Sequence, residues 1–169
     1  MTQRDSFSQA RRAVVVAALS LALPLPVMSQ AVWKVGDRVS LPPLELLDGQ
    51  SVDWAKLSGK VVVLEFWGTW CPFCARQNPV LDKFYRDHQA KGLEVITISL
   101  DKTKDAAIAY MKKGGYAFKA GMATPAWQAI YKQRRGLPQL MVIDRSGKLV
   151  MIEVREMLED DIRDIAKFL

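Results

Sequence analysis

Two runs of apolar residues dominate the hydrophobic pattern of the chain. Val61–Phe66 and Leu93–Leu100 are rich in β-branched and aromatic residues and contain few polar interruptions. Continuous runs of this length are typical of strands that are buried on both faces of a sheet. We therefore predict that both segments are central strands.

Apolar residues at helical spacing predict the elements that follow these strands. One apolar stripe indicates a helix from the cysteine pair to about Gln89. The stripe consists of Val80, Leu81, Phe84 and Tyr85. Pro79 should kink or re-cap this helix, because proline lacks an N–H and crowds the preceding turn. Three further helices are expected at Asp101–Lys113, Pro125–Lys132 and Glu159–Leu169.

Turn residues divide the remainder of the C-terminal half. Asp144–Gly147 separates the apolar segments Gln139–Ile143 and Leu149–Val154, which predicts a β-hairpin. Tyr116–Thr124 has no clear period and is expected to be irregular. The order strand, helix, strand, helix, then hairpin and helix indicates an α/β fold. Its central mixed sheet should be flanked by helices on both faces.

Asp48-Gly49 predicts a second β-hairpin near the N-terminus. It lies between the segments Val35–Leu47 and Ser51–Trp54, and Asp-Gly is a strong hairpin turn signal. Pro42-Pro43 should confine the first arm to the edge of a sheet, because proline cannot donate to a strand ladder.

Residues 1–31 have the pattern of an export signal. Arg11-Arg12 precedes the apolar run Ala13–Leu23, and the small residues around Ser29 fit a signal peptidase. The run is shorter than the about 20 apolar residues of a membrane-spanning helix. We expect a cleaved signal peptide or a retained N-terminal anchor, followed by one domain at 32–169 in the periplasm or another extracytoplasmic compartment.

The composition fits one folded domain and argues against nucleic acid as a partner. Half of the 169 residues are apolar, which is enough for one sizeable core. The formal net charge is +6. Basic pairs such as Lys112-Lys113 and Arg134-Arg135 are too short to indicate nucleic-acid binding and are expected to be solvated.

The segment Cys71-Pro72-Phe73-Cys74 carries the candidate chemistry. Its two thiols are spaced across the first turn of the expected helix and can close into a small disulfide ring. A helix N-terminus favours a thiolate, because unpaired N–H groups and the helix dipole stabilise negative charge. Pro72 suits this turn, where its missing N–H is not needed. A strand that leads to a CxxC at the start of a helix indicates a redox-active pair.

A structural or metal-binding role for the two cysteines is less consistent with the sequence. A disulfide that closes one helical turn restricts the unfolded chain little. Tetrahedral zinc needs further Cys or His ligands, and the single histidine, His88, lies well along the following helix. His88 is expected to face solvent near the end of that helix. We expect neither a metal nor an organic cofactor.

These features together resemble the thioredoxin superfamily, and more narrowly its TlpA/ResA branch of exported thiol–disulfide oxidoreductases. The resemblance extends from about Leu41 to Leu169. It rests on FWGTWCPFC, the hydrophobic strand in front of it and the later GLPQLMVIDRSG. It implies a thioredoxin fold with an added N-terminal β-hairpin at Val39–Trp54.

The resemblance also implies roles for individual residues. Cys71 would be the exposed nucleophile that attacks a substrate disulfide, and Cys74 the more buried thiol that resolves the mixed disulfide. Trp70 would flank the site. Pro138 would be a cis-proline facing the cysteines, and it would turn the Leu137 backbone toward Cys71; the alternative for Pro138 is an ordinary loop proline before a strand.

Glu65 interrupts the first apolar run and is a further candidate catalytic residue. It matches the buried aspartate of thioredoxin, which exchanges a proton with the second cysteine. Desolvation raises the pKa of a buried carboxyl, and a raised pKa suits proton transfer near neutrality. The alternative is a glutamate that reaches solvent at the edge of the sheet.

Three departures from the family pattern bear on the type of substrate. Gln77 stands where members that act in cytochrome c maturation commonly carry a glutamate, three residues after the second cysteine. Gln139 replaces the usual Thr or Ser after the cis-proline, and Pro72-Phe73 is not the common dipeptide of reducing members. Gln77 and Gln139 weaken the case for haem maturation and leave the redox chemistry unaffected, whereas the pair Pro72-Phe73 bears on the reduction potential.

The expected function is therefore reduction of disulfides in substrate proteins, with cytochrome c or copper-site maturation as open roles. An oxidising compartment requires a dedicated electron donor for recycling, such as a membrane protein. The protein is expected to be a monomer. A peroxiredoxin-like protein is disfavoured, since Leu64 and Gly68 occupy the places of its Pro and Thr before Cys71. A copper chaperone remains an alternative, although no histidine follows His88.

Overall fold

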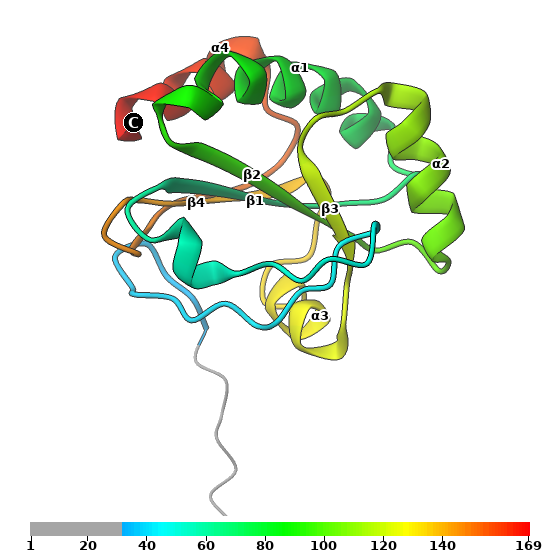
Figure 1. The fold of residues 1–169 in the computed structure, drawn as a ribbon, viewed down its shortest axis with the longest axis horizontal. Helices are drawn as coiled ribbons and strands as arrows, with labels where there is room; N and C mark the ends of the chain where they lie inside the picture. The colour runs from blue at the N-terminus through cyan, green and yellow to red at the C-terminus, as the bar shows by residue number, and fades with distance from the viewer. Residues whose placement is uncertain (1–31) are drawn as a thin grey trace, which may run out of the picture. The chain divides into compact units, whose positions relative to one another are not determined.

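A mixed five-stranded sheet is the centre of the computed structural model, which describes residues 32–169 (Figure 1). The expected signal or anchor at 1–31 lies outside the described residues. The strands are β1 (Val61–Trp67), β2 (Leu93–Ser99), β3 (Lys119–Met122), β4 (Gln139–Ile143) and β5 (Leu149–Val154). They lie in the order β3-β2-β1-β4-β5. β2 pairs in parallel with β1 and β3, whereas β4 pairs antiparallel with both β1 and β5.

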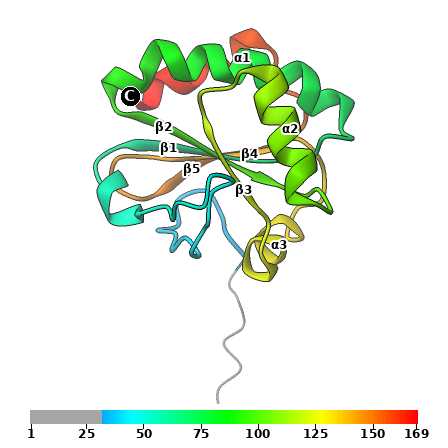
Figure 2. The same cartoon turned by 45° about the vertical axis from the view of Figure 1, so that its right-hand side comes forward.

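Helices cover both faces of this sheet, as the sequence predicted. Helices α1 (Pro72–His88) and α4 (Glu159–Arg163) lie on one face and α3 (Pro125–Tyr131) on the other (Figures 1 and 2). Helix α2 (Lys104–Gly114) packs Ala107 beside the cysteines. Within residues 32–169 there are also three short 3-10 helices: Trp54–Leu57, Gln89–Lys91 and Asp164–Phe168. None of the helices within residues 32–169 is long and apolar enough to cross a membrane.

Strand β1 is buried along its whole length, which confirms the expectation from its apolar run. Alternate side chains enter different cores, because successive residues of a strand point to opposite faces. Val61 and Val63 pack with α1 and α4, whereas Val62, Leu64 and Phe66 pack with α3. Glu65 belongs to the first of these two faces by the same alternation.

The first helix after β1 begins and continues for local reasons. Cys71 is its N-cap and Pro72 occupies the first helical position, where a missing N–H costs nothing. The helix includes Pro79 and ends only at His88, so the proline does not terminate it. Its buried residues include Leu81, Phe84 and Tyr85, three of the four in the predicted stripe.

Three sequence predictions need correction. The segment expected to be irregular contains β3, which forms because Lys119–Met122 pairs with β2. Helix α2 starts at Lys104 rather than Asp101, since the Thr103 side chain caps it. The closing helix is divided into α4 and the 3-10 helix Asp164–Phe168.

The predicted N-terminal hairpin is not formed as two regular strands. The turn at Asp48-Gly49 is present, with Gly49 at a φ of 87°, but the arms share a single antiparallel bridge between Glu45 and Ser51. Two backbone hydrogen bonds, from Leu46 to Gln50 and from Val52 to Leu44, also join the arms, and the rest of the first arm lies along other strands. Residues 36–47, which we call the N-terminal strap, run under the α3 face of the sheet (Figure 1, pale blue to cyan).

The strap hydrogen-bonds near both edge strands of the sheet, β5 and β3. Near β5, the amides of Gly36 and Val39 donate to the carbonyl oxygens of Leu149 and Gly147, at 2.8 and 3.3 Å. Near β3, the Leu47 amide donates to the Ala120 oxygen at 2.8 Å.

Candidate active site

The two cysteines follow the carboxyl end of β1, where the chain turns into α1. They are joined by a disulfide, with their Cα atoms 5.3 Å apart. The Cys71 sulfur accepts a hydrogen bond from the Cys74 amide at 3.1 Å, in the position of a helix N-cap. This amide is one of the donors that a helix N-terminus leaves unpaired, so it is placed to stabilise negative charge on the Cys71 sulfur.

Both cysteines are buried, although Cys71 was expected to be exposed. Cys71 retains 4% of its accessible surface and Cys74 none. The expected exposed nucleophile is therefore nearly covered, because the two sulfurs pack in a cluster with Trp67, Ala107 and Ala120. Cys71 is still the only one of the pair that solvent can reach.

Two exposed aromatic side chains surround the disulfide. Trp70 is 64% exposed and Phe73 is 49% exposed. The Trp70 ring lies against Gly68, where an added Cβ would come within 2.8 Å of it. The Arg76 guanidinium lies 4.9 Å from the centre of the Phe73 ring and forms an ion pair with Glu156 at 2.6 Å. The sulfurs are thus bordered by an apolar surface.

Pro138 lies at the end of the loop before β4, and this loop packs near the cysteines. The peptide bond between Leu137 and Pro138 is cis, and Leu137 packs against the cluster that contains both cysteines. Gln139 follows at the start of β4 and is fully buried. Its side-chain amide has no hydrogen-bond partner among the described residues.

Glu65 is completely buried beneath α1 and does not reach solvent at a sheet edge. Gln77 donates its side-chain amide to Glu65 Oε1 at 2.7 Å. Asn78 supplies a second amide: in the orientation that satisfies both of its side-chain atoms, its nitrogen donates to Glu65 Oε2 at 3.1 Å and also to the Cys74 carbonyl oxygen at 3.1 Å. Desolvation raises the pKa of Glu65 from 4.5 to about 8, although the bond from Gln77 opposes the shift.

The amides that hold Glu65 are themselves held in place. The Gln77 side-chain oxygen accepts a bond from the Met157 amide at 2.6 Å. The Asn78 side-chain oxygen accepts from the Tyr110 hydroxyl at 3.3 Å. The carboxyl therefore lies in a fixed hydrogen-bond network that reaches the Cys74 backbone.

The structure also assigns a positioning role to Asp101, which the sequence analysis did not single out. Its carboxylate accepts bonds from the Thr69 amide at 3.1 Å and from the Thr69 hydroxyl at 2.7 Å. The Ser99 hydroxyl donates to it at 2.8 Å. Asp101 thus fixes the loop that presents Trp70 and Cys71. A Ser-x-Asp sequence at the carboxyl end of β2, beside the end of β1, is the signal that could have found it.

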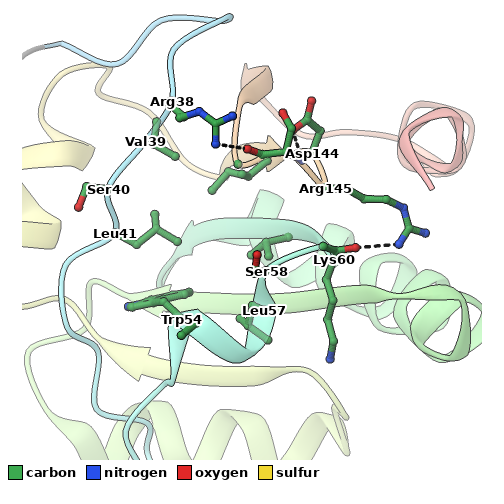
Figure 3. Close-up of a pocket in the computed structure, with 16 residues that line it drawn as sticks. Arg38, Val39, Ser40, Leu41, Trp54, Leu57, Ser58, Lys60, Asp144 and Arg145 are labelled. Atoms are coloured by element: carbon green, nitrogen blue, oxygen red, sulfur yellow. Dashed lines mark hydrogen bonds between the residues drawn. The ribbon is translucent and has the colours of Figure 1, made fainter.

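Other features of the molecule lie away from this site. The His88 ring lies against Phe84 at the far end of α1, with 4.4 Å between ring centres and an angle of 32° between the ring planes. A cavity of about 410 Å³ opens at the opposite end of the sheet, near Trp54 and Val62 (Figure 3). There Arg38 and Arg145 bind the main-chain oxygens of Ser146 and Gly59. Within residues 32–169, no three His, Cys, Asp or Glu side chains are grouped to hold a metal ion.

Fold and site together define a class of protein. A mixed sheet whose central strand leads to a CxxC at a helix N-terminus, opposite a cis-proline, is the arrangement of thiol–disulfide exchange proteins of the thioredoxin superfamily. A family model described as Redoxin matches residues 34–169. The chain belongs to the Redoxin family, as a TlpA/ResA-like member of the thioredoxin superfamily.

Individual relatives agree with this assignment. The chain is 30% identical to the thiol-disulfide oxidoreductase ResA of Bacillus subtilis over 121 residues, which are 72% of this chain and 68% of that protein. It is 25% identical to ResA of Halalkalibacterium halodurans over 94% of this chain and 93% of the relative. A thiol:disulfide interchange protein from Chlorobium tepidum has the same fold, with a TM-score of 0.70, 24% identity, and coverage of 82% of this chain and 97% of the other.

We expect Asp101→Ala to destabilise the protein by about 2 kcal/mol, because it leaves the Thr69 amide and two hydroxyls without their acceptor. Denaturant unfolding of the oxidised protein measures this change. Asp105→Ala is the matched control, since Asp105 is an exposed residue of α2 without an ion pair among residues 32–169. Equal stability of the two variants would show that Asp101 does not hold the loop.

Proposed function

We propose that the reduced protein transfers two electrons from Cys71 and Cys74 to disulfides of substrate proteins. The observation that carries this proposal is the Cys71 sulfur at the N-cap of α1, which accepts a hydrogen bond from the Cys74 amide and belongs to the one cysteine of the pair that keeps any exposed surface. A nucleophilic sulfur must be partly thiolate at neutral pH, and the unpaired N–H groups at a helix N-terminus favour the thiolate form.

The exchange takes place in two balanced steps. The Cys71 thiolate attacks one sulfur of the substrate disulfide, the substrate S–S bond breaks, and the other substrate sulfur leaves as a thiolate that takes up a proton. Cys74 then attacks the Cys71 sulfur of the mixed disulfide as a thiolate. The second substrate thiolate is released, the substrate is reduced, and the protein retains the Cys71–Cys74 disulfide.

Glu65 is proposed to accept the proton of Cys74 before the second step. Cys74 has no exposed surface, so water does not reach its thiol directly. Burial opposes ionisation of that thiol in the absence of a nearby base. Glu65 is buried on the same side of the sheet and is linked to the Cys74 carbonyl through Asn78, and its pKa of about 8 suits proton exchange near neutrality.

Trp70 and Pro138 are proposed to form the surface that receives the substrate. Trp70 is exposed beside Cys71, and the cis-proline loop packs Leu137 against the cysteine cluster. An extended substrate segment can lie between them and pair with the Leu137 backbone.

The location is proposed to be extracytoplasmic, with residues 1–31 as a signal peptide or anchor before the domain at 32–169. In an oxidising compartment the disulfide form accumulates, so a reductant must be recycled by a dedicated donor, which we propose to be a membrane protein. We further propose that the protein works as a monomer.

Substitution of the cysteines tests the order of the two steps. Cys71→Ser should abolish reduction of insulin disulfides, because it removes the attacking sulfur. Cys74→Ser should instead accumulate long-lived mixed disulfides, which non-reducing electrophoresis detects. Faster alkylation of Cys74 than of Cys71 in the reduced protein at mildly acidic pH would reverse the assignment.

Glu65→Gln should slow turnover near neutral pH, and the turnover rate of the variant should recover partly as the pH rises. The glutamine cannot accept a proton, so Cys74 must ionise without a base, which becomes easier only at higher pH. A pH–rate profile of the variant beside the wild type measures the effect. Superimposable profiles would exclude Glu65 from proton transfer.

The same substitution makes a prediction for stability. The folded pKa of Glu65 is raised from 4.5 to about 8, so the folded protein binds one more proton than the unfolded chain between these values. Stability of the wild type should therefore fall as the pH rises from 4.5 to 8, by on the order of 4 kcal/mol. Glu65→Gln should lack this loss and be the more stable protein at pH 8, with little difference at pH 4, as denaturant melts of the oxidised proteins would measure.

N-terminal sequencing of protein from the envelope fraction tests the proposed export. The first residue should lie between about Gln30 and Val32 if the signal is cleaved. A membrane-bound chain that begins at Met1 would indicate the retained anchor, whereas an intact chain in the cytosol would contradict export.

A further inference from the structure

Asn78 is fully buried on α1, and the sequence analysis did not single it out. One end of its side-chain amide meets three oxygen atoms: the Cys74 carbonyl oxygen at 3.1 Å and the two carboxyl oxygens of Glu65 at 3.1 and 3.2 Å. The other end lies 3.3 Å from the Tyr110 hydroxyl. Because only the nitrogen of the amide can donate to oxygens, the nitrogen faces Glu65 and the amide oxygen faces Tyr110.

The Asn78 amide joins the proposed base to the residue whose proton it takes. Its nitrogen carries two hydrogens, which suffice for one bond to the Cys74 carbonyl and one to the Glu65 carboxyl. Gln77 donates to Oε1 of this carboxyl at 2.7 Å, and Asn78 supplies the bond at Oε2. The carboxyl is therefore held by an amide at each of its two oxygens.

Tyr110, on α2, binds the other end of the Asn78 amide. Its ring packs against Trp67, with 4.8 Å between ring centres, and against Tyr116, with 5.7 Å. Desolvation by burial, followed by the neighbouring Tyr116, raises the pKa of Tyr110 above its usual value, so the hydroxyl keeps its proton. That proton is available to the Asn78 oxygen. A bond at this oxygen polarises the amide, which strengthens the bonds that its nitrogen donates.

No cation pairs with Glu65 within residues 32–169. Its partners on the neighbouring strands β2 and β4 are Thr97 and Leu140, which carry no charge. On α1 and α2, the titratable groups next to the amide described above are Cys74 and Tyr110. The ion pair between α1 and the loop after β5 lies at the surface. Hydrogen bonds from amides therefore oppose the burial that favours the neutral form of Glu65.

We propose that Asn78, oriented by Tyr110, is a positioning residue that favours the ionised form of Glu65, the form that can take the proton of Cys74. This inference rests on the proposed role of Glu65. Hydrogen bonds donated to a carboxylate stabilise its charged form, whereas burial favours the neutral form. Asn78 supplies such a bond at the oxygen that Gln77 does not bind, and its second bond fixes the carboxyl relative to the Cys74 backbone.

Asn78→Leu tests the inference, because leucine has the same branching as asparagine and no donor. Without the bond at Oε2, the Glu65 carboxyl should keep its proton to a higher pH, with its pKa raised by about one unit. Infrared titration of the oxidised protein measures this pKa through the carbonyl stretching band of the protonated carboxyl. The band is assigned by its absence from Glu65→Gln.

Tyr110→Phe and a matched control locate the effect. Tyr110→Phe retains the ring that packs on Trp67 and removes only the hydroxyl that binds the amide oxygen. It should raise the pKa of the buried carboxyl in the same direction as Asn78→Leu, by a smaller amount. Tyr131→Phe removes a hydroxyl from α3, on the opposite face of the sheet, and should leave this pKa unchanged.

The pH–rate profile of insulin reduction should follow the titration of the carboxyl. In Asn78→Leu the rise of the rate with pH should move to higher pH, because Glu65 must lose its proton before it can accept one. In the Glu65→Gln background, Asn78→Leu should cause no further shift, since no carboxyl remains. A shift of the same size in both backgrounds would show that Asn78 acts on the fold alone, and would overturn the inference.

The outcomes separate this inference from the proposed function. An unchanged pKa of Glu65 in Asn78→Leu would overturn the inference while the reductase function stands, and Tyr110→Phe decides in the same way if the leucine variant does not fold. A raised pKa with an unshifted rate profile would exclude Glu65 from proton transfer, and the inference with it. Failure of the wild type to reduce insulin would overturn the reductase function itself.

Discussion

Strand β1 is enclosed on both faces of the sheet, and each of its seven residues must find a partner inside the protein. Five of its apolar residues do so by packing into two separate cores, one under α1 and α4 and one under α3, and Trp67 packs against the cysteines. Glu65 has no such solution, because an unpaired buried carboxyl is costly. The side-chain amides of Gln77 and Asn78, both on α1, donate hydrogen bonds to this carboxyl. These bonds help to fix the position of α1 on the sheet.

The same helix also begins at the redox pair. Its first turn presents an amide to the Cys71 sulfur, and its next turn carries Gln77 and Asn78 over Glu65. The sulfur that reacts and the carboxyl that is proposed to take a proton are therefore held by one rigid element. A shift of α1 would change the environment of both groups together, which explains why Gln77 is anchored in turn by the Met157 amide.

Local signals made much of this arrangement predictable. The central strands follow from continuous apolar runs, and the start of α1 follows from a cysteine N-cap before Pro72. The sequence could not indicate β3, since Lys119–Met122 includes Ala and Gly and becomes a strand only by pairing with β2. Asp101 was missed for a related reason: its contact with Thr69 joins residues 32 apart. The near-complete enclosure of Cys71 likewise depends on side chains from β1, α2 and β3.

The N-terminal strap has a consequence for behaviour at high protein concentration. The outermost strands of an open sheet carry unpaired N–H and C=O groups that can template pairing with another molecule. Here the chain itself binds some of them: the Leu47 amide donates to Ala120 of β3, and the Gly36 amide donates to Leu149 at the start of β5. Removal of residues up to 47 would free these acceptors on β3 and at the start of β5, so we expect the strap to oppose pairing with another molecule at these positions.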